Sequence, residues 1–202
     1  MEIVYASFYG CTSLESITIP ESVTEIGNGV FSGCTSLESI TIPDGVTNIG
    51  SNAFEGCTSL EGITIPESVT EIGHGACRGC TSLEMIVVAE GNPVHDSREG
   101  CNAIIETATN TLIQGCKTTV IPDSVTEIGD WAFRGCTSLE SITIPEGVTE
   151  IGECAFEGCT SLESIIIPKS VTEIDYAAFK GCTSLESITI PKSVTEIEYA
   201  SF

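Results

Sequence analysis

The chain repeats one phrase at a fixed spacing of 23 residues. The clearest copies open with Gly-Cys-Thr-Ser-Leu-Glu, and their cysteine recurs at a step of 23 from Cys11 to Cys80 and again from Cys136 to Cys182. A fixed period in this range is typical of stacked-repeat solenoids, in which each copy forms one coil and no copy can bury its apolar face alone. The sequence therefore predicts a single solenoid over residues 1–202, with about eight coils.

One copy, residues 33–55, shows how a coil is built. Ile40 and Ile42 alternate with polar residues, which is the period-2 pattern of a strand with one buried face. Pro43 lacks an N–H group for a strand ladder, so we expect the strand to end there. A second short extended piece follows, and Ala53-Phe54 then predicts a helical or 3₁₀ turn. The apolar groups expected in the core are Leu37, Ile40, Ile42, Val46, Ile49 and Phe54.

The phrase as a whole resembles a known repeat. Cys-Thr-Ser-Leu-Glu-Ser-Ile-Thr-Ile-Pro-x-x-Val-Thr-x-Ile-Gly-x-x-Ala-Phe is similar to the 23-residue leucine-rich repeat of the BspA-like family of bacterial surface proteins, over nearly the whole chain. The resemblance implies a mainly β, right-handed leucine-rich repeat coil. Its parallel β-sheet would be concave, with second short strands and short helical or 3₁₀ turns on the other faces. It also implies a secreted or cell-surface location and a role in adhesion or protein binding.

The charge of the chain argues against some classes of binding partner. There are 29 Asp and Glu residues against 7 Lys and Arg, which gives a net charge of −22. Phosphate backbones are bound through Lys and Arg, so nucleic-acid binding is disfavoured, and anionic membranes would repel this surface. No apolar run is long enough for membrane insertion, and the first residues show no signal peptide. The main purpose we assign to the charge is solubility.

The repeat is interrupted over residues 89–118, where one coil has gained ten residues. Residues 92–101 are turn-rich, and the apolar segments 103–106 and 111–113 around a polar tip predict a β-hairpin. Ala89 replaces the usual proline, so we expect the preceding strand to run on. Insertions in solenoids often carry binding loops, but this irregular coil also fits a surface elaboration without a ligand.

Cysteines recur at the same place in successive coils. In-register parallel side chains do not give the torsion angle of a disulfide, so we predict a ladder of buried thiols, with disulfide or metal binding as the alternative. Cys77 takes the place that Phe54 has one coil earlier and is expected in the core. Cys101, in the turn-rich insert, is expected to be the most exposed thiol. The members of the predicted ladder are Cys11, Cys34, Cys57, Cys80, Cys116, Cys136, Cys159 and Cys182.

No residue set in the sequence predicts catalysis. His74 and His95 lie in different coils, and neither has a ligand at metal-binding spacing. Nucleophilic catalysis needs a base beside a distinct nucleophile, and glycoside hydrolysis needs two carboxylates in different environments, whereas the repeat makes its carboxylates alike. We therefore expect neither an enzyme nor a cofactor or metal.

The outward side of the predicted concave sheet is the candidate binding surface. One column of glutamates runs along it, and it serves either to bind basic partners or cations, or to keep the exposed face from aggregating. Met85, Val87 and Ile166 interrupt the neighbouring polar columns as apolar positions, and His95 and Arg98 come from the insert. The glutamates are Glu15, Glu38, Glu61, Glu84, Glu140, Glu163 and Glu186.

These features favour a non-catalytic module that binds a protein, such as a host or matrix protein, or a glycan. It would bind through the concave face and the irregular coil. The alternative is a passive spacer or stalk that presents another domain, and an enzyme ranks last. Residues 2–8 resemble residues 196–202, so the chain opens and closes within a coil. Uncapped solenoid ends expose apolar core, which predicts a fragment of a longer array and end-to-end self-association.

Overall fold

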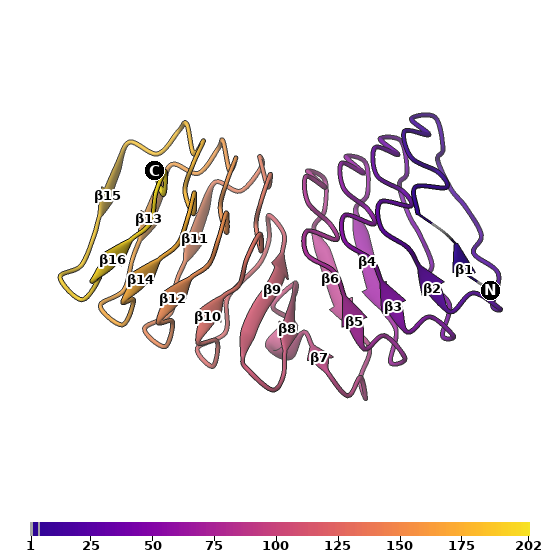
Figure 1. The fold of residues 1–202 in the computed structure, drawn as a ribbon, viewed down its shortest axis with the longest axis horizontal. Coiled ribbons are helices and arrows are strands. Elements are labelled where there is room, and N and C mark those ends of the chain that lie inside the picture. The colour runs from indigo at the N-terminus through magenta and orange to yellow at the C-terminus, as the bar shows by residue number, and fades with distance from the viewer. Residues whose placement is uncertain (1, 4) are drawn as a thin grey trace.

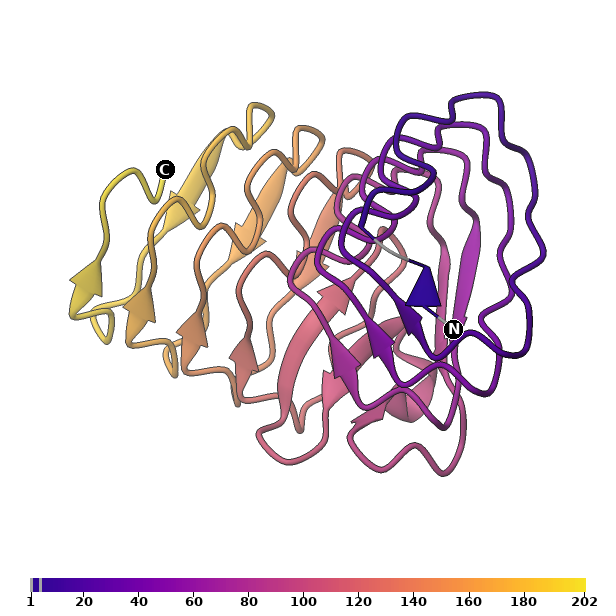
Figure 2. The same ribbon diagram turned by 45° about the vertical axis from the view of Figure 1, so that its right-hand side comes forward.

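The chain forms a mainly β solenoid of about eight turns with almost no helix. The computed structural model describes residues 2–3 and 5–202. The coils lie one on another from the N-terminal to the C-terminal end (Figures 1 and 2). Equivalent residues of successive coils pair in parallel, as Ile26 pairs with Ile49 and Ile49 with Ile72. The stacking predicted from the 23-residue period is thus confirmed.

Two ladders of short strands run along the stack. The first, here named the Val-Thr ladder, is built from the Val-Thr-x-Ile segments, and the hairpin strands of the irregular coil join its second part. Its sheets have the orders β1-β2-β3-β5 and β16-β14-β12-β10-β9-β8-β7. The strands in the first are β1 (Glu2–Ile3), β2 (Glu25–Ile26), β3 (Asn48–Ile49) and β5 (Glu71–Ile72). The repeat strands in the second are β10 (Glu127–Ile128), β12 (Glu150–Ile151), β14 (Glu173–Ile174) and β16 (Glu196–Ile197).

The other ladder, named the Ile-Thr-Ile ladder, is built from the strand segments that precede each proline. Its two sheets have the orders β4-β6 and β11-β13-β15, and a single bridge joins Thr18 to Thr41 in the first coils. Buried isoleucines alternate with exposed residues along these strands, as the period-2 pattern predicts. The strands are β4 (Gly62–Ile65), β6 (Met85–Val88), β11 (Ser141–Thr143), β13 (Ser164–Ile166) and β15 (Ser187–Thr189).

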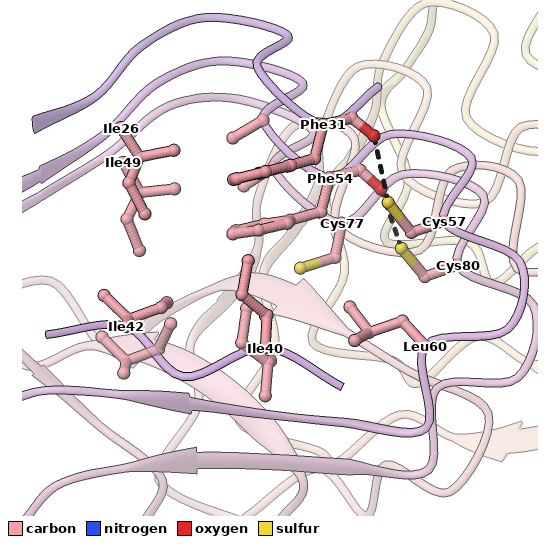
Figure 3. Packing of buried hydrophobic residues seen from close by; sticks show 14 of the residues in the cluster. Ile26, Phe31, Ile40, Ile42, Ile49, Phe54, Cys57, Leu60, Cys77 and Cys80 are labelled. Carbon is pink, nitrogen blue, oxygen red and sulfur yellow. Dashed lines mark hydrogen bonds between the residues drawn. The ribbon is translucent and has the colours of Figure 1, made fainter. Parts of the chain in front are cut away.

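Aliphatic and aromatic columns fill the space between the ladders (Figure 3). All the apolar residues predicted for the type coil are buried, from Leu37 to Phe54. The phenylalanines stack ring on ring, with centroids 5.7 Å apart between Phe31 and Phe54 and 5.0 Å apart between Phe133 and Phe156. Offset ring stacks of this spacing add stabilisation beyond the area that they bury. Each coil therefore completes the core of its neighbours.

The segment around Ala53 and Phe54 is a series of turns and not a helix. The Cys57 N–H donates to the Phe54 carbonyl over 3.1 Å, which is a single i→i+3 bond. Asn52 and Gly56 have φ angles of 56° and 68°. Left-handed residues cannot continue a right-handed helix, so each turn ends within four residues. Among the described residues, the only helical segment is η1 (Arg98–Gly100).

The predicted ladder of buried thiols is confirmed in part, since Cys116 lies outside it and donates instead to the Asn102 carbonyl. Cys57 and Cys80 each donate from Sγ to the carbonyl of the phenylalanine 26 residues earlier, over 3.2 and 3.1 Å (Figure 3). Burial raises the pKa of Cys57 to about 12, so its thiol stays protonated at neutral pH. The prediction for Cys101 is wrong, because its side chain is buried although its segment is turn-rich, and Cys11 is the exposed thiol.

The irregular coil folds around a hairpin of two antiparallel strands. β8 (Ala103–Glu106) and β9 (Thr111–Gly115) pair with each other, and β7 (His95–Asp96) pairs with β8. β9 then pairs in parallel with β10 and so takes the place of a Val-Thr strand. The expected extension of β6 past Ala89 is not found. The strand ends at Val88, and Ala89 adds one backbone bond to Ile65.

A buried glutamine joins the coils on either side of the irregular one. Gln114 Oε1 accepts from the Cys77 N–H over 3.2 Å, and its Nε2 donates to the Ala132 carbonyl over 3.2 Å. In regular coils the corresponding bond is direct, from the Phe54 N–H to the Ala76 carbonyl. The side-chain amide of Gln114 therefore acts as an inserted peptide group. It satisfies the buried N–H of Cys77, which would otherwise lack an acceptor.

Candidate binding face

The outward side of the Ile-Thr-Ile ladder, named here the β-face, carries the predicted glutamate column. In-register pairing aligns these residues, as Ser141 with Ser164 and Ser164 with Ser187. The neighbouring glutamate of each coil therefore falls in one row, about 4.8 Å from the next. All seven are exposed: Glu15, Glu38, Glu61, Glu84, Glu140, Glu163 and Glu186.

Three apolar side chains interrupt the polar columns of the β-face. Met85 and Val87 both project outward from β6, and Met85 is 50% exposed. Ile166 lies on β13 and is 80% exposed, away from the other two. The Met85 side chain extends over Gly62 of β4, where an added Cβ would lie 3.0 Å from its Cε. The structure thus brings Met85 and Val87 together on one strand and places Ile166 apart from them.

Two residues of this surface were missed by the sequence reasoning. Counting back from Ile121-Pro122 aligns residues 116–122 with the strand phrase, so Lys117 takes a glutamate position and Val120 a threonine position. Val120 is 71% exposed, and Lys117 Nζ lies 2.8 Å from Glu84 Oε1. The sequence feature that could have identified both residues is the Ile-Pro-x-x-Val sequence at the end of the irregular coil. The same alignment puts Cys116 in a leucine position rather than in the cysteine ladder.

His95 and Arg98, the two binding candidates from the insert, lie outside the β-face. His95 is only 4% exposed, because the turn-rich segment folds back against the Val-Thr ladder. Arg98 forms two bonds to Asp96, of 2.8 and 2.6 Å, and one of 2.9 Å to Asn110 Oδ1. Burial would raise the pKa of Asp96, but its bonds to Arg98 outweigh this and hold the pKa below its usual value. Arg98 is therefore an internal brace of the irregular coil.

Over residues 2–3 and 5–202, no group of three His, Cys, Asp or Glu side chains is close enough to hold a metal ion. Within the same residues, no helix has the length and hydropathy to cross a membrane.

The structure does bring His74 and His95 to one cleft, which their positions in different coils did not predict. The outward rows of the β-face offer carboxylates and apolar contacts for binding.

Stacked 23-residue coils with two parallel ladders and a leucine, isoleucine and phenylalanine core define a leucine-rich repeat solenoid. Residues 1–101 and 106–202 match the BspA type leucine rich repeat region, in six copies. The chain therefore belongs to the BspA-type leucine-rich repeat family. The family and fold are those of leucine-rich repeat proteins, which are generally non-enzymatic.

Solved bacterial structures resemble the chain over most of its length. A leucine rich cell surface protein of Faecalibacterium prausnitzii is 34% identical with a TM-score of 0.72, over 98% of this chain and 59% of that one. The pneumococcal vaccine antigen PcpA is 28% identical with a TM-score of 0.80, over 91% of this chain and 47% of that one. The chain thus spans about half the length of these two structures. None of the functionally curated proteins matches it significantly.

Proposed function

We propose that this chain is a non-catalytic protein-binding module of a bacterial surface protein, and that it binds through the β-face around β6. The observation that carries the proposal is the exposed pair Met85 and Val87, which lie on one strand of a face that is otherwise mostly polar or acidic. Exposed apolar anchors within a polar rim are where binding energy concentrates in protein interfaces. We expect the β-face to be the concave side of the solenoid.

The charge of the face selects the kind of partner. The exposed glutamate row next to Met85 carries one charge per regular coil, and the one ion pair that involves it in the described residues is Glu84 with Lys117. A basic surface would meet complementary charge along the row and gain in association rate. We therefore propose a partner protein with a basic face and an apolar side chain that contacts Met85. A glycan is the alternative ligand.

The comparisons support a surface location for the proposed module. One similar structure is described as a cell surface protein and another as a vaccine antigen. We propose surface display or secretion for this chain and adhesion to host or matrix proteins as its use. End-to-end association of copies is also part of the proposal, because Ile197 and Phe202 of the last coil are 47% and 50% exposed. Light scattering at increasing protein concentration tests this association.

The test is a binding screen of the chain against purified matrix proteins and glycans. The variant Glu38→Lys/Glu61→Lys/Glu84→Lys is expected to lose at least tenfold in affinity, because it reverses the charge of three successive positions in the row. The matched control is Asp44→Lys/Glu67→Lys/Glu90→Lys. It makes the same change of charge six residues later in the same coils, outside the β-face.

A second variant tests the apolar anchor. Met85→Ser/Val87→Thr restores the residues of a regular coil and should also weaken binding about tenfold, since it removes exposed apolar surface without changing charge. If no ligand binds, or if both β-face variants bind like the parent chain, the proposal fails and the passive spacer becomes the better explanation.

A further inference from the structure

A cleft of about 430 Å³ lies where the Val-Thr ladder is interrupted. The first sheet of this ladder ends at β5, and the second begins at the hairpin of the irregular coil. The cleft is lined by both parts of the molecule, with Glu71 and His74 from one side and Glu106, Glu127 and Asp130 from the other. It shares no residue with the β-face, so what it binds does not depend on the function proposed above.

The charge in the cleft is negative and is not neutralised by the residues that line it. Four carboxylates line it, and no lysine or arginine does. Neutral side chains orient three of them: Glu71 accepts from Asn48 Nδ2 over 2.5 Å, Glu106 from Thr109 Oγ1 over 2.6 Å and Glu127 from Thr111 Oγ1 over 3.2 Å. Carboxylates oriented in this way favour a cation that enters the cleft.

His95 gives independent support for a ligand. His95 lines the cleft and is 4% exposed, and its Nδ1 has no hydrogen-bond partner among the described residues. A buried polar atom without a partner destabilises the folded state, so such atoms in folded proteins usually indicate a missing partner. Burial lowers the pKa of His95, against the opposing effects of the Val69 carbonyl, Glu106 and Asp96. The ring is therefore neutral at pH 7 and offers one nitrogen lone pair.

The size and walls of the cleft indicate the class of cation. The described residues include no group of three ligands that could hold a metal ion, and the volume exceeds that needed by a bare ion. Ile72 and Ile113 add apolar wall beside the carboxylates. An apolar wall next to fixed acceptors suits a cation on an aliphatic stem, because such a group buries its stem while its head stays polar.

We propose that this cleft binds an aliphatic ammonium or guanidinium group, the chemistry of a lysine or arginine side chain. The head group lies among the carboxylates and donates to Nδ1 of His95, and the stem packs against Ile72 and Ile113. Such a group reaches the cleft either on a protein partner or as a free polyamine.

The test uses the whole chain and small probes in calorimetric titrations. Nα-acetyl-lysine amide and Nα-acetyl-arginine amide are expected to bind at least tenfold more tightly than Nα-acetyl-norleucine amide, which keeps the stem and lacks the charge. Cadaverine is the probe for a free polyamine, and whether it or the lysine amide binds more tightly distinguishes the two sources. In ¹⁵N spectra the His95 ring nitrogens should shift on binding. Equal affinities for the lysine and norleucine amides would overturn the proposal.

Variants locate the binding in the cleft. Glu106→Gln/Glu127→Gln should weaken the lysine probe at least tenfold, and its matched control Glu90→Gln/Glu146→Gln, which removes two exposed charges elsewhere, should not. His95→Phe keeps a ring and removes the nitrogen, and it should also weaken binding. If this variant does not fold, as judged by circular dichroism, the glutamate pair still decides. Unchanged affinity in the Glu106→Gln/Glu127→Gln variant would show that the probe binds elsewhere.

Discussion

The regular coils and the irregular coil stack on their neighbours by different means. Between regular coils, the same backbone hydrogen bonds and ring stacks recur at each step. For example, the Thr47 N–H donates to the Thr24 carbonyl over 2.9 Å, and the rings of Phe31 and Phe54 stack. Around the irregular coil, side chains replace these contacts, chiefly Gln114 and Asn92. Regular coils stack because equivalent groups meet at every step, whereas the irregular coil needs particular side chains at particular positions.

Asn92 shows how specific these replacements are. Its Nδ2 donates to the carbonyls of Pro66 and Val69 over 2.9 and 2.8 Å, and its Oδ1 accepts from the Val94 and His95 N–H groups. One amide thus joins the insert to the preceding coil and shapes the turn that follows. The comparison teaches that regularity distributes stability over many equal contacts, while the irregular coil concentrates it in a few.

The largest effect is expected from removing one ring of a regular coil. Phe156 is fully buried between Phe133 and Phe179, with centroid distances of 5.0 and 5.3 Å. Phe156→Ala should lower the free energy of unfolding by about 3–5 kcal/mol, because it leaves a cavity in a rigid stack. Urea titration measures this, with the exposed Glu146→Ala as a control expected within about 0.5 kcal/mol of the parent. A loss below about 1 kcal/mol would contradict a role of the ring stack in stability.

A smaller loss is expected in the irregular coil. Gln114→Leu should cost about 1–3 kcal/mol, because the Cys77 N–H loses its acceptor while Ala132 keeps its bond from the Gly115 N–H. Hydrogen exchange should speed up at the Cys77 amide and stay unchanged at the Phe54 amide. Ala108→Ser at the exposed hairpin tip is the control. Unchanged exchange at Cys77 would mean that the side chain does not hold the two halves together.

The smallest effect concerns charge repulsion between regular coils. Burial and the neighbours Glu173, Glu150 and Asp130 raise the pKa of Asp175 to about 6, from 3.8. The folded state therefore binds this proton more tightly than the unfolded chain, so the stability contributed by this group rises as the pH falls from about 6 to 4. Asp175→Asn should stabilise the chain at pH 7 by a few tenths of a kcal/mol, as expected for relief of like-charge neighbours.

Thermal unfolding at pH 7 and pH 4 checks this prediction. The gain from Asp175→Asn should disappear at the lower pH, where the parent carboxyl is protonated, and so uncharged, in the folded state. A gain that persists at pH 4 would show that the substitution acts through packing or hydrogen bonding rather than through charge.

Much of the regular part could be predicted from sequence because the period determines which residues are neighbours. The alternation of Ile40 and Ile42, the buried thiol of Cys57 and the exposure of Glu38 all follow from stacking one coil on the next. The extra Ala89 bond and the left-handed turn at Asn52 are local details of backbone conformation that periodicity does not determine.

The contacts of the irregular coil could not be predicted from the sequence because they are not periodic. The role of Gln114 follows only once Cys77 and Ala132 are known to lie on either side of it. The turn-rich composition around His95 and Cys101 predicts exposure, but the insert folds back on the first part of the chain and buries both side chains. The cleft and its histidines therefore became visible only in the structure.

The 23-residue period also sets the length of the loop that each contact between neighbouring coils closes. A contact between regular coils closes a loop of 23 residues at every step, so adding coils lengthens the molecule without raising the entropy cost per coil. The bond from Gly79 to Arg134 spans 55 residues, and bringing those ends together costs about 0.8 kcal/mol more than closing one regular coil. Together with the Gln114 bridge, that bond is a long-range closure that joins two otherwise locally assembled halves.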